Sequence, residues 1–168
     1  MPDIKDRKHL VDALVEIVND AGREIMKVYA SNFDVVTKDD DSPLTQADLA
    51  SHHAIRNALH RLTPDIPVLS EESNLLDFAT RSNWSRYWLV DPLDGTKEFI
   101  NRNGEFTVNI ALVENGRATC GVVLAPAKER MWIGDGANGA FELHAPEGGA
   151  LDVSRAKSIR ARPAPAQG

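Results

Sequence analysis

Cysteine, aromatic residues and long apolar runs are all scarce in this chain of 168 residues. The single cysteine, Cys120, excludes an intrachain disulfide framework and a cysteine-rich zinc site, which fits a reducing compartment. No stretch approaches the ~20 apolar residues of a membrane-spanning helix, and residues 1–10 lack the apolar run of a secretory signal. The net charge of −6 lacks the basic excess that is typical of proteins binding nucleic acid or anionic membranes.

The residues that are present suit one globular domain. Hydrophobic residues make up 42% of the chain and charged residues 26%, which is enough apolar material for a core. At roughly 150 residues per domain, the length indicates about one domain. We expect this domain to cover residues 1–153. Residues 154–168 contain one large aliphatic residue and no aromatic residue, which predicts a disordered tail.

Two helices are expected in the first part of the chain. Apolar residues recur at helical spacing from Leu10 to Tyr29, which predicts a first amphipathic helix. Residues 45–48 (TQAD) resemble a capping box that begins a second helix, and this helix is expected to end before Thr63. Between the helices, residues 33–37 predict a short strand. Residues 38–41 (KDDD) predict a solvated loop, because consecutive side chains diverge and do not cluster around a metal.

Extended segments dominate the remainder. Short apolar runs at residues 66–69 and 87–90 predict buried strands that both end on carboxylates. Alternation over residues 106–113 and 118–124 predicts an antiparallel pair. Residues 131–143 predict a hairpin around a glycine-rich turn. This turn matches the G-x-G-x-x-G pattern, but a strand and not the helix of a dinucleotide-binding site is expected after it. The fold expected is α+β, with two N-terminal helices packed on a mostly antiparallel sheet.

Residues 88–100 (WLVDPLDGTKEFI) carry the most chemical information. A strand ends at Asp91, the following proline fixes a turn, and Asp94 comes three positions later, so both carboxylates can face one point. The same turn frees the carbonyl of Leu93. Oxygen ligands of this kind are those that magnesium prefers. In isolation the D-P-x-D-G pattern is equally consistent with a plain turn.

Other residues suit a phosphate or have simple structural roles. Gly95 permits a close backbone approach, and a short helix beginning at Thr96 would direct its amide and hydroxyl at a phosphate oxygen. Asp48 by itself is best explained as part of the capping box, worth about 1 kcal/mol, although a catalytic role is compatible with capping. His52 and His53 show no ligand pattern, so packing or surface roles are expected.

Three blocks occur together and in order: residues 42–48 (SPLTQAD), 69–72 (LSEE) and 88–110. With these blocks the chain resembles the magnesium-dependent, lithium-sensitive phosphatase superfamily that includes inositol monophosphatases. Lys97-Glu98-Phe99 makes it more similar to the CysQ-like 3′(2′),5′-bisphosphate nucleotidases. The resemblance covers about residues 10–153. It implies an inositol-monophosphatase-like N-terminal domain, with the second α/β domain of the family absent.

The resemblance also assigns a role to each site residue. The residues that match the family's metal ligands are Glu71, Asp91, Asp94 and, through its carbonyl, Leu93. The residues that match substrate contacts are Glu71, Leu93, Asp94, Gly95 and Thr96. Asp48 matches the aspartate that, with Thr96, orients and deprotonates the attacking water. Glu72 is then expected to hold water or a ligand. The implied cofactor is Mg²⁺, as two or three ions.

The implied activity is magnesium-dependent hydrolysis of adenosine 3′,5′-bisphosphate to AMP and phosphate, with the sulfated nucleotide as a further candidate substrate in sulfur assimilation. The implied partner is this small nucleotide bisphosphate, with neither nucleic acid nor a membrane span, and the oligomeric state stays open. The implied location is cytoplasmic, which leaves open a peripheral association with the inner membrane face.

Two alternatives to this activity remain open. One is an inositol monophosphatase. The other is a truncated metal- or phosphate-binding remnant without turnover. In family members, an aspartate in a Trp-Asp pair of the second half completes the metal site. No aspartate follows Trp84, Trp88 or Trp132 in this chain.

Overall fold

The computed structural model describes residues 7–37, 43–73, 77–149 and 151–163. The loop predicted at residues 38–41 and the end of the predicted tail, residues 164–168, lie outside the described residues. No helix in the described part of the chain is long and apolar enough to cross a membrane.

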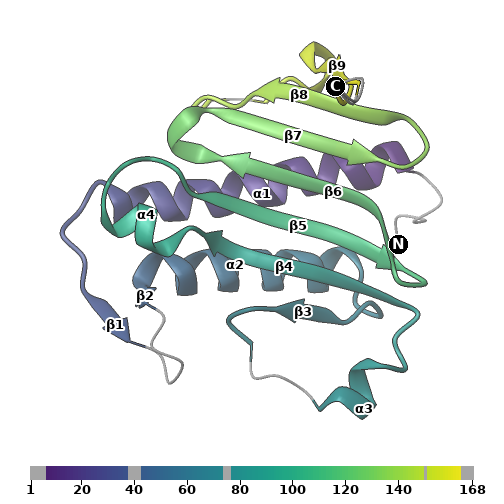
Figure 1. Ribbon diagram of the computed structural model, residues 1–168, viewed down its shortest axis with the longest axis horizontal. Helices are drawn as coiled ribbons and strands as arrows, with labels where there is room; N and C mark the ends of the chain where they lie inside the picture. Colours follow the sequence, from purple (N-terminus) through teal and green to yellow (C-terminus); the bar gives the residue numbers. More distant parts are fainter. Residues whose placement is uncertain (1–6, 38–42, 74–76, 150, 164–168) are drawn as a thin grey trace, which may run out of the picture.

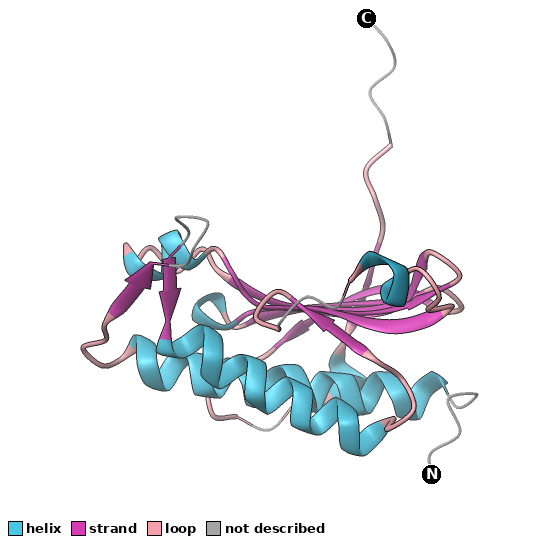
Figure 2. Ribbon diagram, turned by 90° about the horizontal axis from the view of Figure 1, so that it is seen from below, coloured by secondary structure: helices cyan, strands magenta, loops and turns pink. Residues whose placement is uncertain are grey.

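Two long helices lie on one face of a seven-stranded sheet (Figure 2). They are α1 (Arg7–Tyr29) and α2 (Gln46–Leu62), as the apolar periodicity and the capping box predict. Both pack against the sheet and against each other, whereas the opposite face of the sheet carries neither of them (Figure 2). The predicted α+β class, with two N-terminal helices on one side of a sheet, is confirmed.

The strands of the large sheet lie side by side in chain order, as Figure 1 shows. They are β3 (Val68–Ser70), β4 (Arg86–Asp94), β5 (Thr107–Glu114), β6 (Arg117–Ala125), β7 (Arg130–Asp135), β8 (Gly139–His144) and β9 (Lys157–Ile159). Only the pair β3 and β4 is parallel, and every other neighbouring pair is antiparallel. The glycine-rich segment is the turn of the β7–β8 hairpin, as predicted.

Shorter elements surround this sheet. They are β1 (Val35–Thr37) paired with β2 (Pro43–Thr45), the helices α3 (Phe78–Arg81) and α4 (Thr96–Ile100), and the 3₁₀ turns η1 (Pro126–Lys128) and η2 (Val153–Arg155). α4 follows β4 directly, and its buried side chain Phe99 anchors it in the core. The fully buried ring of Phe99 contacts Tyr29, Phe33 and Phe106, with ring centroids about 5 Å apart.

The core lies between the helices and the sheet. Alternate residues of the strands face α1 and α2, among them Trp88, Val108, Ile110 and Leu124. α1 approaches β6 closely because residue 22 is glycine: a Cβ atom there would lie 2.5 Å from the Leu124 side chain. Cys120 is buried in this core, and burial raises the pKa of its thiol to about 11, as expected for a packing residue.

The prediction of a disordered tail is wrong for part of that segment. Residues 157–159 form β9, which pairs with the edge of β8 through Ala140↔Ile159 and Glu142↔Lys157. Composition indicates how much apolar surface a segment can bury, but an edge strand also offers unpaired backbone groups. Pairing with β8 orders this short segment although its residues remain largely exposed.

Candidate active site

The capping box at the start of α2 brings Asp48 to Thr96. Asp48 is only 1% exposed, and its Oδ2 accepts hydrogen bonds from the backbone N–H of Thr45 at 2.7 Å and from the Thr45 hydroxyl at 2.6 Å. Its other oxygen, Oδ1, accepts from the Thr96 hydroxyl at 3.2 Å. One carboxylate oxygen therefore caps the helix while the other faces the loop after β4. The structural and catalytic interpretations of Asp48 are compatible.

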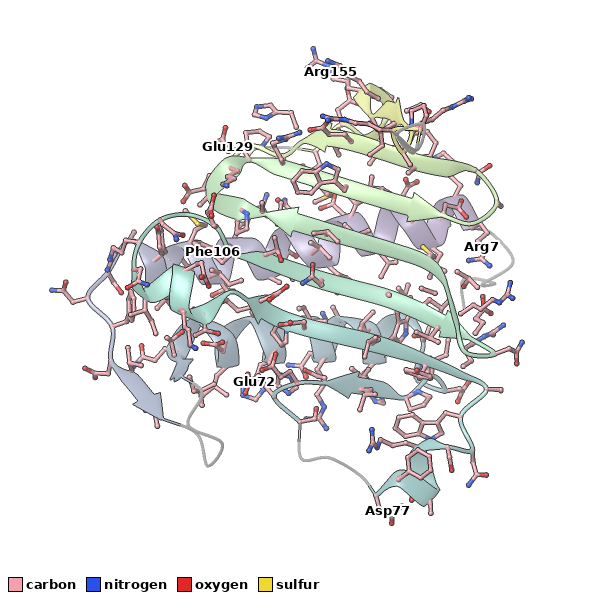
Figure 3. All side chains as sticks on the ribbon, viewed as in Figure 1. Arg7, Glu72, Asp77, Phe106, Glu129 and Arg155 are labelled. Carbon is pink, nitrogen blue, oxygen red and sulfur yellow. The ribbon has the colours of Figure 1, made fainter. Side chains whose placement is uncertain are left out.

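The parallel pairing of β3 and β4 places two carboxylate segments at one edge of the sheet. Ser70 is paired with Val90, so Glu71 and Asp91 follow at the same level, and the backbone N–H of Glu71 donates to the Val90 carbonyl at 3.2 Å. Figure 3 shows Glu72 beside this end of β3, where its side chain is half-buried. Carboxylates predicted from two separate sequence blocks therefore lie together.

Asp91 is the most perturbed of these acids. Its pKa is raised to about 7, first by burial and then by the negative charges of Glu71 and Asp94, while a hydrogen bond from the backbone N–H of Leu93 opposes the shift. Its Oδ1 atom is buried and has no hydrogen-bond partner. A cluster of acids with one such oxygen is unfavourable without a positive charge beside it.

An irregularity in β4 shapes the loop that carries the remaining site residues. The register between β4 and β5 shifts between Asp91 and Asp94, and the Leu93 carbonyl lies 3.4 Å from the Thr96 hydroxyl. Gly95 then adopts a φ of +92°, and a Cβ atom there would lie 2.9 Å from the Glu105 carbonyl oxygen. Glycine is required here to turn β4 into α4, which begins at Thr96 as predicted.

Asn109 also belongs to this edge, and the sequence interpretation did not assign it to the site. It faces Asp91 across β4 and β5, and its amide donates to Asp94 Oδ2 at 3.3 Å and to the Thr107 hydroxyl at 3.1 Å. The sequence held only a partial signal: the alternation of β5 puts Asn109 on the face opposite the buried Val108 and Ile110, and the register with β4 then places it across from Asp91.

The donor set suits a divalent cation. Glu71, Asp91 and Asp94 are hard oxygen donors close enough to influence one another, and the orphaned Asp91 Oδ1 offers a lone pair that no protein group uses. Among the described residues, no three His, Cys, Asp or Glu side chains already form a group that could hold a metal. The fit therefore lies in the chemistry and proximity of the donors, and binding would require side-chain movement.

A cavity of about 500 Å³ adjoins the carboxylates on the sheet face that lacks the two helices. Its polar lining includes Glu71, Asp91, Asn109 and the basic Arg81, and its apolar lining includes Leu89, Ala111 and Val123. Leu89 is 45% exposed although it lies in the middle of β4. The acidic edge thus borders an open and mostly apolar surface.

Comparison with known proteins places these features in a family context. The profile described as the inositol monophosphatase family matches residues 6–162. The chain is 54% identical over 125 residues to the 3′(2′),5′-bisphosphate nucleotidase CysQ of Escherichia coli O157:H7, covering 73% of this chain and 50% of that protein. It is 45% identical over 121 residues to the CysQ nucleotidase of Buchnera aphidicola, covering 71% of this chain and 45% of that protein.

A solved structure agrees with the sequence relatives. The crystal structure of CysQ from Bacteroides thetaiotaomicron, a bacterial member of the inositol monophosphatase family, superposes with a TM-score of 0.77 at 36% identity. The match covers 93% of this chain and 59% of that one. The chain thus spans about half the length of the curated relatives it matches.

Proposed function

Because the chain belongs to the inositol monophosphatase family, we propose that it supplies the metal- and phosphate-binding part of a magnesium-dependent 3′(2′),5′-bisphosphate nucleotidase. Its substrate is adenosine 3′,5′-bisphosphate, and its products are AMP and phosphate. The observation that carries the proposal is the contact between Asp48 and Thr96 beside the acids Glu71, Asp91 and Asp94 at one edge of the sheet. The sulfated nucleotide is a second substrate to test.

The proposed cofactor is Mg²⁺, on which enzymes of this family generally depend. Two or three ions would bind, and their ligands would be Glu71, Asp91, Asp94 and the Leu93 carbonyl. Bound magnesium would supply charge neutralisation of the phosphate and a more acidic water. The chain's negative charge would in part serve this purpose, since clustered carboxylates recruit the cations that a phosphate dianion needs.

Asp48 and Thr96 would handle the proton. Asp48 Oδ2 is already occupied by Thr45, so Oδ1 is the oxygen that can accept a proton from the attacking water. The Thr96 hydroxyl donates its single proton toward Asp48 Oδ1 or the Leu93 carbonyl, and its lone pairs can accept from the same water. Gly95 and Thr96, at the start of α4, would contact the phosphate.

Two alternatives make different predictions. An inositol monophosphatase would prefer inositol phosphate, and several structural relatives have that activity in their names, such as an IMPase of Thermotoga maritima at 26% identity and a TM-score of 0.71. A metal-binding remnant would bind Mg²⁺ without turnover. Identities of 54% and 45% to two CysQ nucleotidases, against 26% to this IMPase, favour the nucleotidase. A cytoplasmic location, with or without peripheral membrane association, remains a prediction.

Phosphate release by the full chain tests the proposal. We expect magnesium-dependent release from adenosine 3′,5′-bisphosphate to exceed release from inositol phosphate. Asp94→Asn should abolish it while preserving the fold. Asp65→Asn, in an exposed turn, is the matched control. Preference for inositol phosphate would favour the first alternative. Magnesium binding without phosphate release would favour the remnant. Near-normal turnover by Asp94→Asn would remove that residue from the site.

A further inference from the structure

One face of α2 contacts both segments that carry the proposed metal ligands. Asp48, Ser51 and His52 lie at positions i, i+3 and i+4 of this helix, so their side chains share a face. All three are buried, with exposed fractions of 1%, 0% and 5%. A buried polar face on a helix that packs against a sheet requires partners on that sheet.

Ser51 contacts the segment between the aspartates. Its hydroxyl donates to the Pro92 carbonyl at 2.7 Å, although the two residues are 41 positions apart in the chain. Pro92 lies where the register of β4 and β5 shifts, so the strand ladder constrains this segment less than regular pairing would. The Ser51 hydrogen bond therefore fixes the backbone between Asp91 and Asp94.

His52 contacts the other segment. Its Nδ1 atom lies 2.8 Å from the hydroxyl of Ser70, which is 2% exposed and directly precedes Glu71. Burial lowers the pKa of His52, and the neighbouring His53 and Arg56 lower it further, so the imidazole is neutral at pH 7. A neutral ring and a hydroxyl can form this bond in either direction, and it holds the end of β3 against α2.

We propose that Ser51 and His52 are positioning residues that set the spacing of the two ligand-bearing segments for magnesium. This inference rests on the proposed function and deepens it. Because α2 also carries Asp48, a single rigid helix would align the proton acceptor with both ligand segments. In other metal sites, residues that orient the metal ligands without touching the metal contribute about 10- to 100-fold to metal affinity.

Magnesium titration of the full chain by calorimetry tests this inference without requiring turnover. Ser51→Ala and His52→Leu should each weaken Mg²⁺ binding about tenfold. His52→Asn should keep the affinity within about threefold of that of the unmodified chain, because the asparagine amide can take the place of Nδ1 in the hydrogen bond with Ser70. His60→Leu, at an exposed position of the same helix, should leave the affinity unchanged.

The possible results separate the inference from its premise. The inference would be overturned if the folded Ser51→Ala and His52→Leu chains bound Mg²⁺ as tightly as the unmodified chain. A loss in His52→Leu that His52→Asn does not reverse would also overturn it, because packing and not the hydrogen bond would then be responsible. If His52→Leu does not fold, the smaller Ser51→Ala change and the His52→Asn chain decide. An unmodified chain that binds no Mg²⁺ would contradict the proposed function itself.

Discussion

Replacing Asp91 by asparagine should stabilise the metal-free protein at pH 8 and remove its response to magnesium. The pKa of Asp91 is raised from 3.8 to about 7 in the folded chain. An acid with a raised pKa adds stability below the unfolded value, and this contribution disappears as the pH rises through the folded value. The metal-free protein should therefore lose stability between about pH 4 and pH 7. Asparagine is neutral throughout and avoids this loss.

The size of the effect follows from the shift. About three pKa units correspond to roughly 4 kcal/mol at about 1.4 kcal/mol per unit. Asp91 is only partly buried, and solvent screening reduces this value to about 2 kcal/mol. For a chain of this length, about 2 kcal/mol raises the midpoint of thermal unfolding by about 4–8 °C. Magnesium at ten times its dissociation constant should add about 1.4 kcal/mol to the unmodified protein only.

Thermal unfolding at pH 5 and pH 8, in chelator and in magnesium, measures all of these quantities. Asp65→Asn makes the same chemical change in an exposed turn and should shift the midpoint by less than about 2 °C. An Asp91→Asn chain no more stable than the unmodified protein at pH 8 in chelator would refute the buried-charge argument. A magnesium-induced shift that survives the substitution would refute the assignment of Asp91 as a ligand.

Three further predictions concern other parts of the site and its support. Gly95→Ala should cost about 1–3 kcal/mol in a denaturant titration, because alanine is strained at a φ of +92° and its Cβ would meet a backbone oxygen; an unchanged midpoint would contradict this. Trp88→Phe should cost about 1–3 kcal/mol, since it removes the 2.9 Å hydrogen bond from the indole to the Thr63 hydroxyl and leaves a gap in the core; a stability equal to that of the unmodified protein would show that the bond is dispensable. Thr96→Val should change stability by less than about 1 kcal/mol yet abolish magnesium-dependent phosphate release, and release at the normal rate would remove the hydroxyl from proton handling.

Local sequence patterns predicted the elements whose cause is local. The apolar stripe of α1 and the capping box of α2 both appear as predicted, because helical spacing and cap chemistry act within a few residues. The glycine-rich pattern between β7 and β8 was likewise identified as a hairpin and not as a dinucleotide-binding motif, because a strand follows its glycines. Local patterns could not predict that Glu71 lies near Asp91, because the parallel pairing of β3 and β4 joins distant parts of the chain. That prediction came from the family resemblance.

Residues whose role depends on a distant partner escaped the sequence interpretation. His52 was expected to have only a packing or surface role, and its contact with Ser70 follows from how α2 lies across the end of β3. Asn109 reads as an ordinary polar residue of an alternating strand until the register places it opposite Asp91. β9 escaped because its stability comes from the edge of β8 and not from its own composition.

Several unfavourable or irregular features gather in this site, and buried residues next to it support them. Asp91 has a buried oxygen without a partner, Gly95 takes a left-handed conformation, and β4 departs from regular pairing between them. These features are supported by the fully buried Trp88 and Phe99 and by the polar face of α2. Since a buried polar atom without a partner persists only where the surrounding structure enforces it, the unpaired Asp91 Oδ1 is consistent with a binding site. A cation at the carboxylates would then relieve a cost that the fold already bears, which links magnesium affinity directly to the stability of this edge.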